Sequence, residues 1–206
     1  MTLRFVYDFS ATKAALLYLM GKGLNRFDKY KAAKLLFLAD REHLLRFGRT
    51  ISGDSYDALP YGPVPSETLA LLDGIEAVKT EGAASDDLQV IELANSIEST
   101  EGRYPEYRAL VDVDLDALSE SDIKVLDHVA LEHGNKSFQE LFDLTHAMGA
   151  YKNAWRDEST HKRFPMRFED FFADNPEKAD FLSELLEDQF LETAYMKAAH
   201  TGRAAI

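Results

Sequence analysis

The sequence predicts a mainly α-helical domain of the α+β class, in which a compact helical body carries a small β-hairpin. Apolar residues recur at spacings of three and four between residues that typically begin and end helices. One stretch, residues 52–65, contains three prolines and two glycines and interrupts this pattern. A chain of 206 residues fits one hydrophobic core, so we expect residues 1–206 to form a single domain, with 162–206 as a C-terminal helical extension.

The first two helices are predicted from their ends and from one fully apolar centre. The first is expected over residues 10–22, with Ser10 as its cap. The second is expected to run from the cap Asp28 to the stop signal Gly48. Its centre, residues 35–39, is apolar nearly all round, which predicts that neighbouring elements cover it on more than one side.

The middle of the chain is expected to be partly extended. Residues 52–65 should form an extended piece with tight turns, and residues 66–75 return to helical spacing. Residues 88–93 alternate roughly between apolar and polar, which indicates a strand that pairs with residues 104–111. These two segments are the expected hairpin.

The second half of the chain reads as helical. Helices are expected after the caps Ser119, Ser137 and Asn175, with a further short helix at residues 150–156. The last helix should reach about Ala198. Its inward stripe is expected to hold Ala179, Leu182, Leu186, Gln189 or Phe190, and Tyr195. Its opposite side is strongly acidic and carries Asp180, Glu184, Glu187, Asp188 and Glu192.

Composition excludes several classes of function. Without cysteine, the chain forms no disulfide, no thiolate zinc site and no cysteine nucleophile. No apolar run is long enough to span a bilayer and no secretory signal is evident, so we expect a cytoplasmic protein without a membrane partner. The formal net charge of −13 disfavours nucleic acid as a partner and favours a basic one.

Several blocks of sequence occur in an order that is typical of one family. Residues 30–49 read YKAAKLLFLADREHLLRFGR, and Gly53-Asp54 and then Pro60-Tyr61-Gly62-Pro63-Val64 follow. Further on come Tyr104-Pro105, the helix start at 118–123, Ser137-Phe138, Thr145-His146 and Trp155. Together these blocks resemble the Panacea domain of SocA- and GepA-like antitoxins over roughly half the chain. The phenylalanine-rich segment 164–172 and the long C-terminal helix fall outside the resemblance.

The resemblance implies a mostly helical antitoxin of a bacterial or phage toxin–antitoxin system, with a place in phage defence. Such a protein neutralises a cognate toxin, usually encoded beside it, by direct protein–protein binding. In one branch of the family the antitoxin is instead an adaptor that delivers the toxin to a protease, and this alternative stays open. The resemblance implies no enzyme, no catalytic residue, no cofactor and no metal. The identity of the toxin and the oligomeric state are left undetermined.

The candidate partner-binding residues combine the block from Lys34 to Val64 with two residues further along the chain. They are Lys34, Asp40, Arg41, Asp54, Tyr56, Tyr61, Pro63, His146 and Trp155.

Each of the more distinctive candidates also has a simpler, structural interpretation. Asp40 falls on an apolar stripe and needs donors, so it is expected to fix the fold through backbone amides or an arginine near residues 53–56, with partner contact as the alternative. Tyr61 is either an anchor on a proline-stiffened turn or a ring packed on the central helix. His146 is expected to be a hydrogen-bonded structural residue and Trp155 a core residue, although both could face one groove.

A catalytic function is the least favoured hypothesis. A hydrolase or nucleotide-binding enzyme would use Asp40, His43 or His146, but the sequence has no phosphate loop, nucleophile elbow or paired metal ligands. Asp40, Glu42 and His43 do not share the i, i+4 spacing of a helical metal site, since successive helical positions point ~100° apart. No shared metal is therefore expected there.

Overall fold

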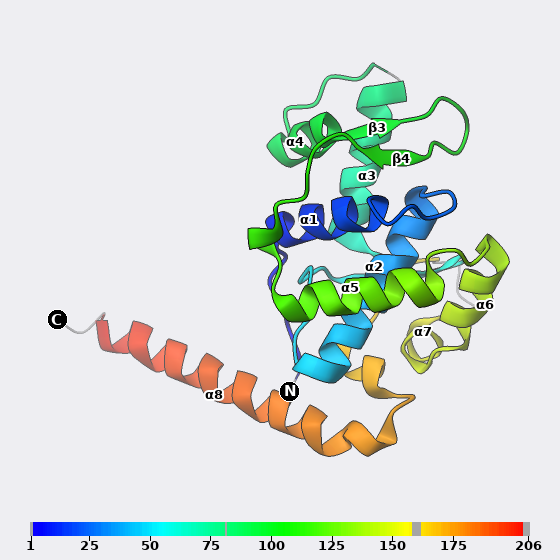
Figure 1. Ribbon diagram of the computed structural model, residues 1–206. Coiled ribbons are helices and arrows are strands. Elements are labelled where there is room, and N and C mark those ends of the chain that lie inside the picture. The colour runs from blue at the N-terminus through cyan, green and yellow to red at the C-terminus, as the bar shows by residue number, and fades with distance from the viewer. Residues whose placement is uncertain (1, 81, 158–161, 204–206) are drawn as a thin grey trace.

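The computed structural model describes residues 2–80, 82–157 and 162–203 and shows a helical body with a long C-terminal helix (Figure 1). The mainly α, α+β class is confirmed. The helices are α1 (Phe9–Met20), α2 (Lys29–Phe47), α3 (Ser66–Thr80), α4 (Leu88–Ser96), α5 (Glu120–His133), α6 (Phe138–Ala147), α7 (Gly149–Ala154) and α8 (Ala179–Arg203). Short 3₁₀ turns are η1 (Leu115–Ala117), η2 (Phe168–Phe172) and η3 (Pro176–Lys178). The strands are β1 (Tyr56–Leu59), β2 (Gly62–Pro65), β3 (Ile97–Ser99), β4 (Tyr107–Ala109) and β5 (Phe164–Pro165).

Helix α2 lies at the centre of the body, as its apolar centre predicts. It contacts α1, α3, α5, α6 and β2, and residues 35–39 are all buried. The Asp28 side chain accepts the Lys31 amide at 2.9 Å at one end. Gly48 adopts the left-handed conformation at the other, with φ of 77°. Both predicted ends of this helix are confirmed.

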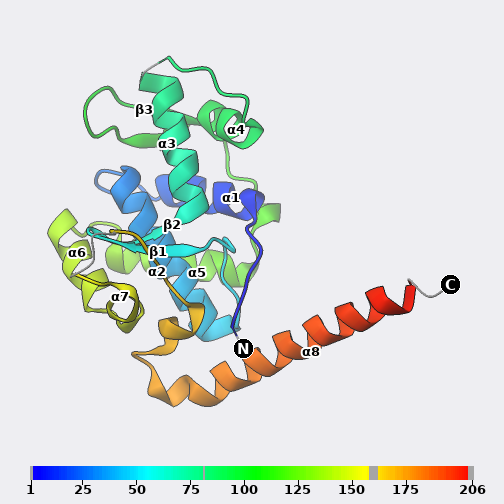
Figure 2. The same cartoon turned by 180° about the vertical axis from the view of Figure 1, so that it is seen from behind.

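Two small antiparallel sheets complete the architecture. In the first, β1 lies between β2 and β5, with Tyr56 opposite Pro65 and Asp57 opposite Pro165. The proline-rich segment, expected only as extended chain with turns, therefore forms a hairpin of its own. The second sheet pairs β3 with β4, and it lies with α4 at the end of α3 that is remote from α8 (Figure 2).

The hairpin predicted further along exists, but its first strand was misplaced. Residues 88–93 are helical, because the Asp87 side chain accepts the amides of Gln89 and Val90 and starts α4. The strand begins only at Ile97. A short apolar run fits both periodicities, and the packing of Val90 against Gly74 of α3 decides for the helix.

Of the four other predicted caps, two are confirmed and two are wrong. Ser119 and Ser137 each form a capping box, as expected. The cap of α1 is Asp8 and not Ser10, because the Asp8 carboxylate accepts the Ala11 amide at 3.0 Å. Asn175 gives no side-chain cap to the backbone and instead binds Glu177.

Helix α8 packs on the body through only part of its length. The side chains that rest on the core are Phe181, Leu182, Leu185 and Leu186. Ala179 and Tyr195, which were expected on the inward stripe, are exposed, so that part of the prediction is wrong. Of the two alternatives given for the next position, Gln189 faces the body and Phe190 is exposed. Within the described residues, no helix has the length and apolar character needed to cross a membrane.

Candidate functional site

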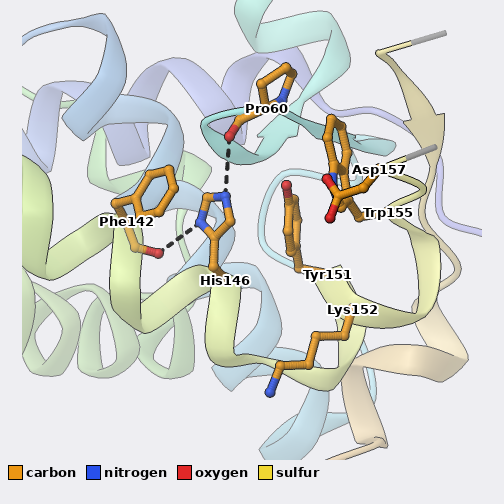
Figure 3. Close-up of a pocket in the computed structure, with 7 residues that line it drawn as sticks. All are labelled: Pro60, Phe142, His146, Tyr151, Lys152, Trp155 and Asp157. Carbon is orange, nitrogen blue, oxygen red and sulfur yellow. Dashed lines mark hydrogen bonds between the residues drawn. The ribbon is translucent and has the colours of Figure 1, made fainter. Parts of the chain in front are cut away.

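The turn between β1 and β2 lies beside α6 and α7 and forms one wall of a surface hollow. The hollow has a volume of about 600 Å³. Its lining residues are Pro60, Phe142, His146, Tyr151, Lys152, Trp155 and Asp157 (Figure 3). In Figure 3 the amine of Lys152 points away from the carboxylate of Asp157, which itself accepts a hydrogen bond from the indole of Trp155.

A continuous series of rings runs along this wall and is called the aromatic row below. It consists of Phe138, Phe142, His146, Tyr151 and Trp155. Neighbouring ring centroids are 6.2, 3.6, 4.3 and 5.8 Å apart in that order. The first three rings share one face of α6 because they are spaced four residues apart. Tyr61 at the hairpin tip extends the row, with its ring 6.2 Å from that of Phe138.

His146 ties α6 to the hairpin turn. Its Nδ1 lies 2.8 Å from the Phe142 carbonyl oxygen and its Nε2 lies 3.2 Å from the Pro60 carbonyl oxygen. A carbonyl only accepts, so both bonds form together when both ring nitrogens carry a proton. The Tyr151 hydroxyl donates to the Leu59 carbonyl oxygen at 2.9 Å and holds the same turn from the α7 side. The expected structural role of His146 agrees with these contacts.

Lys34 contacts the β1–β2 hairpin from the interior of the protein. Its side chain is fully buried, and its Nζ donates to the Pro63 carbonyl oxygen at 2.7 Å. The same Nζ lies 4.9 Å from the centroid of the Tyr30 ring. Burial lowers the pKa of the Lys34 amine to about 7. Gly62, with φ of +100°, leaves room for this amine, because a Cβ there would lie 3.1 Å from Nζ.

Asp40 lies at the centre of a second, fully buried network. Its carboxylate accepts the amides of Ile51 and Ser52 at 2.7 and 3.0 Å, the Ser52 hydroxyl, and the Tyr56 hydroxyl at 2.7 Å. Burial raises the pKa of the Asp40 carboxyl, and these four hydrogen bonds oppose that effect. These contacts agree with the fold-fixing interpretation of Asp40, although the two amides belong to Ile51 and Ser52, just before the expected residues 53–56.

Asp54 fixes the start of α3 in a similar way. Its carboxylate accepts the Glu67 amide at 2.9 Å, the Thr68 amide at 2.8 Å and the Thr68 hydroxyl at 2.7 Å. Arg41 also forms its hydrogen bonds within the protein. Its guanidinium donates to the side chains of Asp174 and Asn175, which precede α8, at 3.2 and 3.1 Å. Both side chains connect elements of the fold.

His43 joins α2 to α5 through hydrogen bonds. Its Nδ1 lies 2.8 Å from the Arg49 carbonyl oxygen, and its Nε2 lies 3.0 Å from the Ser121 hydroxyl and from Asp122. Burial by itself raises the pKa of the Asp122 carboxyl. Hydrogen bonds from His43, Arg49 and Ser119 have the opposite and together larger effect, so the pKa lies well below its usual range. Among the described residues, no three His, Asp or Glu side chains are placed to hold a metal ion.

A sequence model of the family described as "Antitoxin SocA-like, Panacea domain" matches residues 33–152. The chain belongs to this antitoxin family. No curated protein and no solved structure matches the chain. The Panacea match begins in α2 and ends in α7, so it includes the hairpin and most of the aromatic row. Trp155, η2 and α8 lie beyond it.

The Panacea domain brings together only some of the residues singled out from the sequence. Five of them are buried inside the domain and offer little surface to a partner: Lys34, Asp40, Asp54, Tyr56 and Pro63. Tyr61 is exposed by 65%, and His146 and Trp155 line the hollow beside it. Sequence reasoning missed Phe142 and Tyr151 as site residues. The four-residue spacing of Phe138, Phe142 and His146 on a predicted helix was the signal that marks this face.

Proposed function

We propose that this Panacea-family chain neutralises a cognate toxin protein by binding it directly, without making or breaking a bond. The contact surface is the aromatic row together with Tyr61. Its support is one observation: a series of rings lies on the hairpin and on α6–α7, and hydrogen bonds to Pro60 and Leu59 hold the turn in place. Tyr61 and Phe138 are exposed, Phe142, His146 and Trp155 are half-buried, and Tyr151 lies beneath them as a buried support. Aromatic side chains in a supported position supply much contact area at low entropic cost.

The wider setting is part of the same proposal. The toxin is encoded next to this chain and is met in the cytoplasm, and its surface is basic, since the chain has a formal net charge of −13. The proposed binding site contains an intrinsic fluorescent probe. Trp155 is the only tryptophan of the chain, so its fluorescence reports on the hollow alone.

The test is co-expression with the product of the adjacent reading frame. Wild-type chain should restore growth, and Tyr61→Ala should weaken protection while leaving thermal stability nearly unchanged. Trp155→Phe should also weaken protection, and it keeps an aromatic ring against Tyr151 and Phe164 so that the fold is maintained. Tyr104→Ala is the matched control, because Tyr104 is exposed by 64% and lies between β3 and β4, away from the row. Titration with purified toxin should shift the emission of Trp155.

The level of toxin during rescue decides the mechanism. A steady amount of toxin in a stable complex supports neutralisation by binding. Rapid loss of toxin would instead indicate delivery to a protease. Full protection by both ring variants would remove the aromatic row from the interface.

A further inference from the structure

Helix α8 consists of a docked half and a half that stands clear of the body. In the docked half, the Gln189 side chain exchanges two hydrogen bonds with the backbone of Arg4, at 3.0 and 2.8 Å. Beyond Gln189 the large apolar side chains are open to solvent. Phe190, Leu191 and Tyr195 are exposed by 53%, 63% and 75%. In both views the last turns lead away from every other element (Figure 1, Figure 2).

The exposed residues include a complete stripe on the side of α8 that is turned away from the body. Successive helical residues advance by ~100°, so Leu191 points ~120–180° away from the leucines that dock the helix. The stripe has the spacing of one helix face and is called the outward face here. Its members are Asp180, Glu184, Glu187, Leu191 and Tyr195, and all five are exposed. The body cannot cover this face, because its own contact is on the opposite side.

The outward face combines negative charge with an apolar end. Among the described residues, none of the three carboxylates takes part in an ion pair, so their charge is not neutralised within the chain. Leu191 and Tyr195 follow directly along the stripe, and Phe190 flanks them. A groove that is basic at one end and apolar at the other would complement both parts. Docking of an amphipathic helix into such a groove is a common mode of recognition.

We propose that the outward face of α8 is a second docking surface, which lies in a basic, apolar groove of the toxin. This inference rests on the proposed function and adds a contact outside the region that matches the family. A partner would also stabilise the free half of α8, since an isolated helix of about 12–15 residues is only marginally stable in water.

A second copy of the chain is the less suitable occupant. A parallel pairing of two outward faces would bring three carboxylates of one copy against those of the other, and an antiparallel pairing would place them against apolar Leu191 and Tyr195. Each copy also carries a formal net charge of −13. Like charges placed against one another oppose association. Charge complementarity therefore favours a basic partner.

The first experiment measures affinity for the toxin, the product of the adjacent reading frame, with two glutamine substitutions on α8. Leu191→Gln with Tyr195→Gln removes the apolar end and preserves charge and helix propensity. We expect at least a tenfold loss of affinity. Leu131→Gln is the matched control, because Leu131 is exposed by 79% on α5 and should change little. Circular dichroism verifies that each variant is folded.

The second experiment addresses charge and location. Asp180→Asn, Glu184→Gln and Glu187→Gln together should slow association at low salt and flatten its salt dependence. Hydrogen exchange should show protection of residues 190–203 only in the complex.

The outcomes separate this inference from the function on which it rests. If the wild-type chain fails to neutralise the toxin, both the proposed function and the α8 docking surface are refuted. If wild type neutralises but the α8 double variant binds as tightly as Leu131→Gln, only the α8 surface is refuted. Light scattering that shows a wild-type dimer, lost in Leu191→Gln, would assign the face to self-association and overturn the proposal.

Discussion

Burial of Lys34 predicts that the stability of this protein rises with pH near neutrality. The amine is fully buried beneath the hairpin, where it donates a hydrogen bond to the Pro63 carbonyl oxygen. Burial lowers its pKa from 10.5 to about 7. The unfolded chain therefore holds this proton over a pH range in which the folded chain has released it. Stability rises with pH wherever the unfolded state binds more protons.

The magnitude follows from the width of that range. The slope approaches about 1.4 kcal/mol per pH unit above pH 7, which gives a gain of about 2 kcal/mol between pH 7 and pH 9. For a chain of this size, that gain corresponds to roughly 4–8 °C in Tm. Measurements stop at pH 9 because tyrosines begin to ionise in the unfolded chain near pH 10.

The assay compares wild type with Lys34→Met by urea unfolding at several pH values. Methionine is similar in length and apolar, so it fills the site without a titrating group. Effects of other ionisable groups cancel in the difference between the two proteins. The free energy of unfolding of wild type should gain about 2 kcal/mol relative to Lys34→Met from pH 7 to pH 9. Lys79→Met, at an exposed lysine of α3, should give no such change. Parallel curves for wild type and Lys34→Met would refute the reasoning.

Three further substitutions test the buried networks by urea or thermal unfolding. Asp40→Asn should lower the free energy of unfolding by about 2 kcal/mol, because an amide cannot accept from all four donors; unchanged stability would contradict the network. Gly53→Ala should cost at least 2 kcal/mol more than Gly23→Ala, since both have φ of 66° but only the Cβ at position 53 meets a backbone atom, 1.9 Å from the Val6 carbonyl oxygen. Equal costs would rule out that clash. Asp122→Asn should destabilise at pH 7, and its deficit should shrink below about pH 4, where the unfolded carboxyl protonates first and wild type loses its advantage. A deficit that is independent of pH would show that the charge of Asp122 does not matter.

The sequence was most informative where local interactions decide the structure. The limits of α2 followed from Asp28 and Gly48, because a cap satisfies amides only two or three residues away. It was least informative for residues 88–93, where a short apolar run fits both a strand and a helix. There the Asp87 cap and the contact with α3 decide.

The candidate site shows the same division. Tyr61, His146 and Trp155 were all singled out from the sequence, but their proximity depends on contacts between residues about ninety positions apart, such as His146 with Pro60 and Tyr151 with Leu59. No local pattern encodes such distances.

By itself, the sequence determined the helical class, both ends of α2, the starts of α5 and α6, the acidic charge and the family of this protein, because these depend on residue type and short-range spacing. Only the tertiary structure decided which polar groups are buried and which side of α8 faces the body. Burial and facing depend on neighbours that the chain meets only after it has folded. That is why Lys34, singled out for partner binding, supports the hairpin from inside, while Tyr61 remains in solvent at its tip.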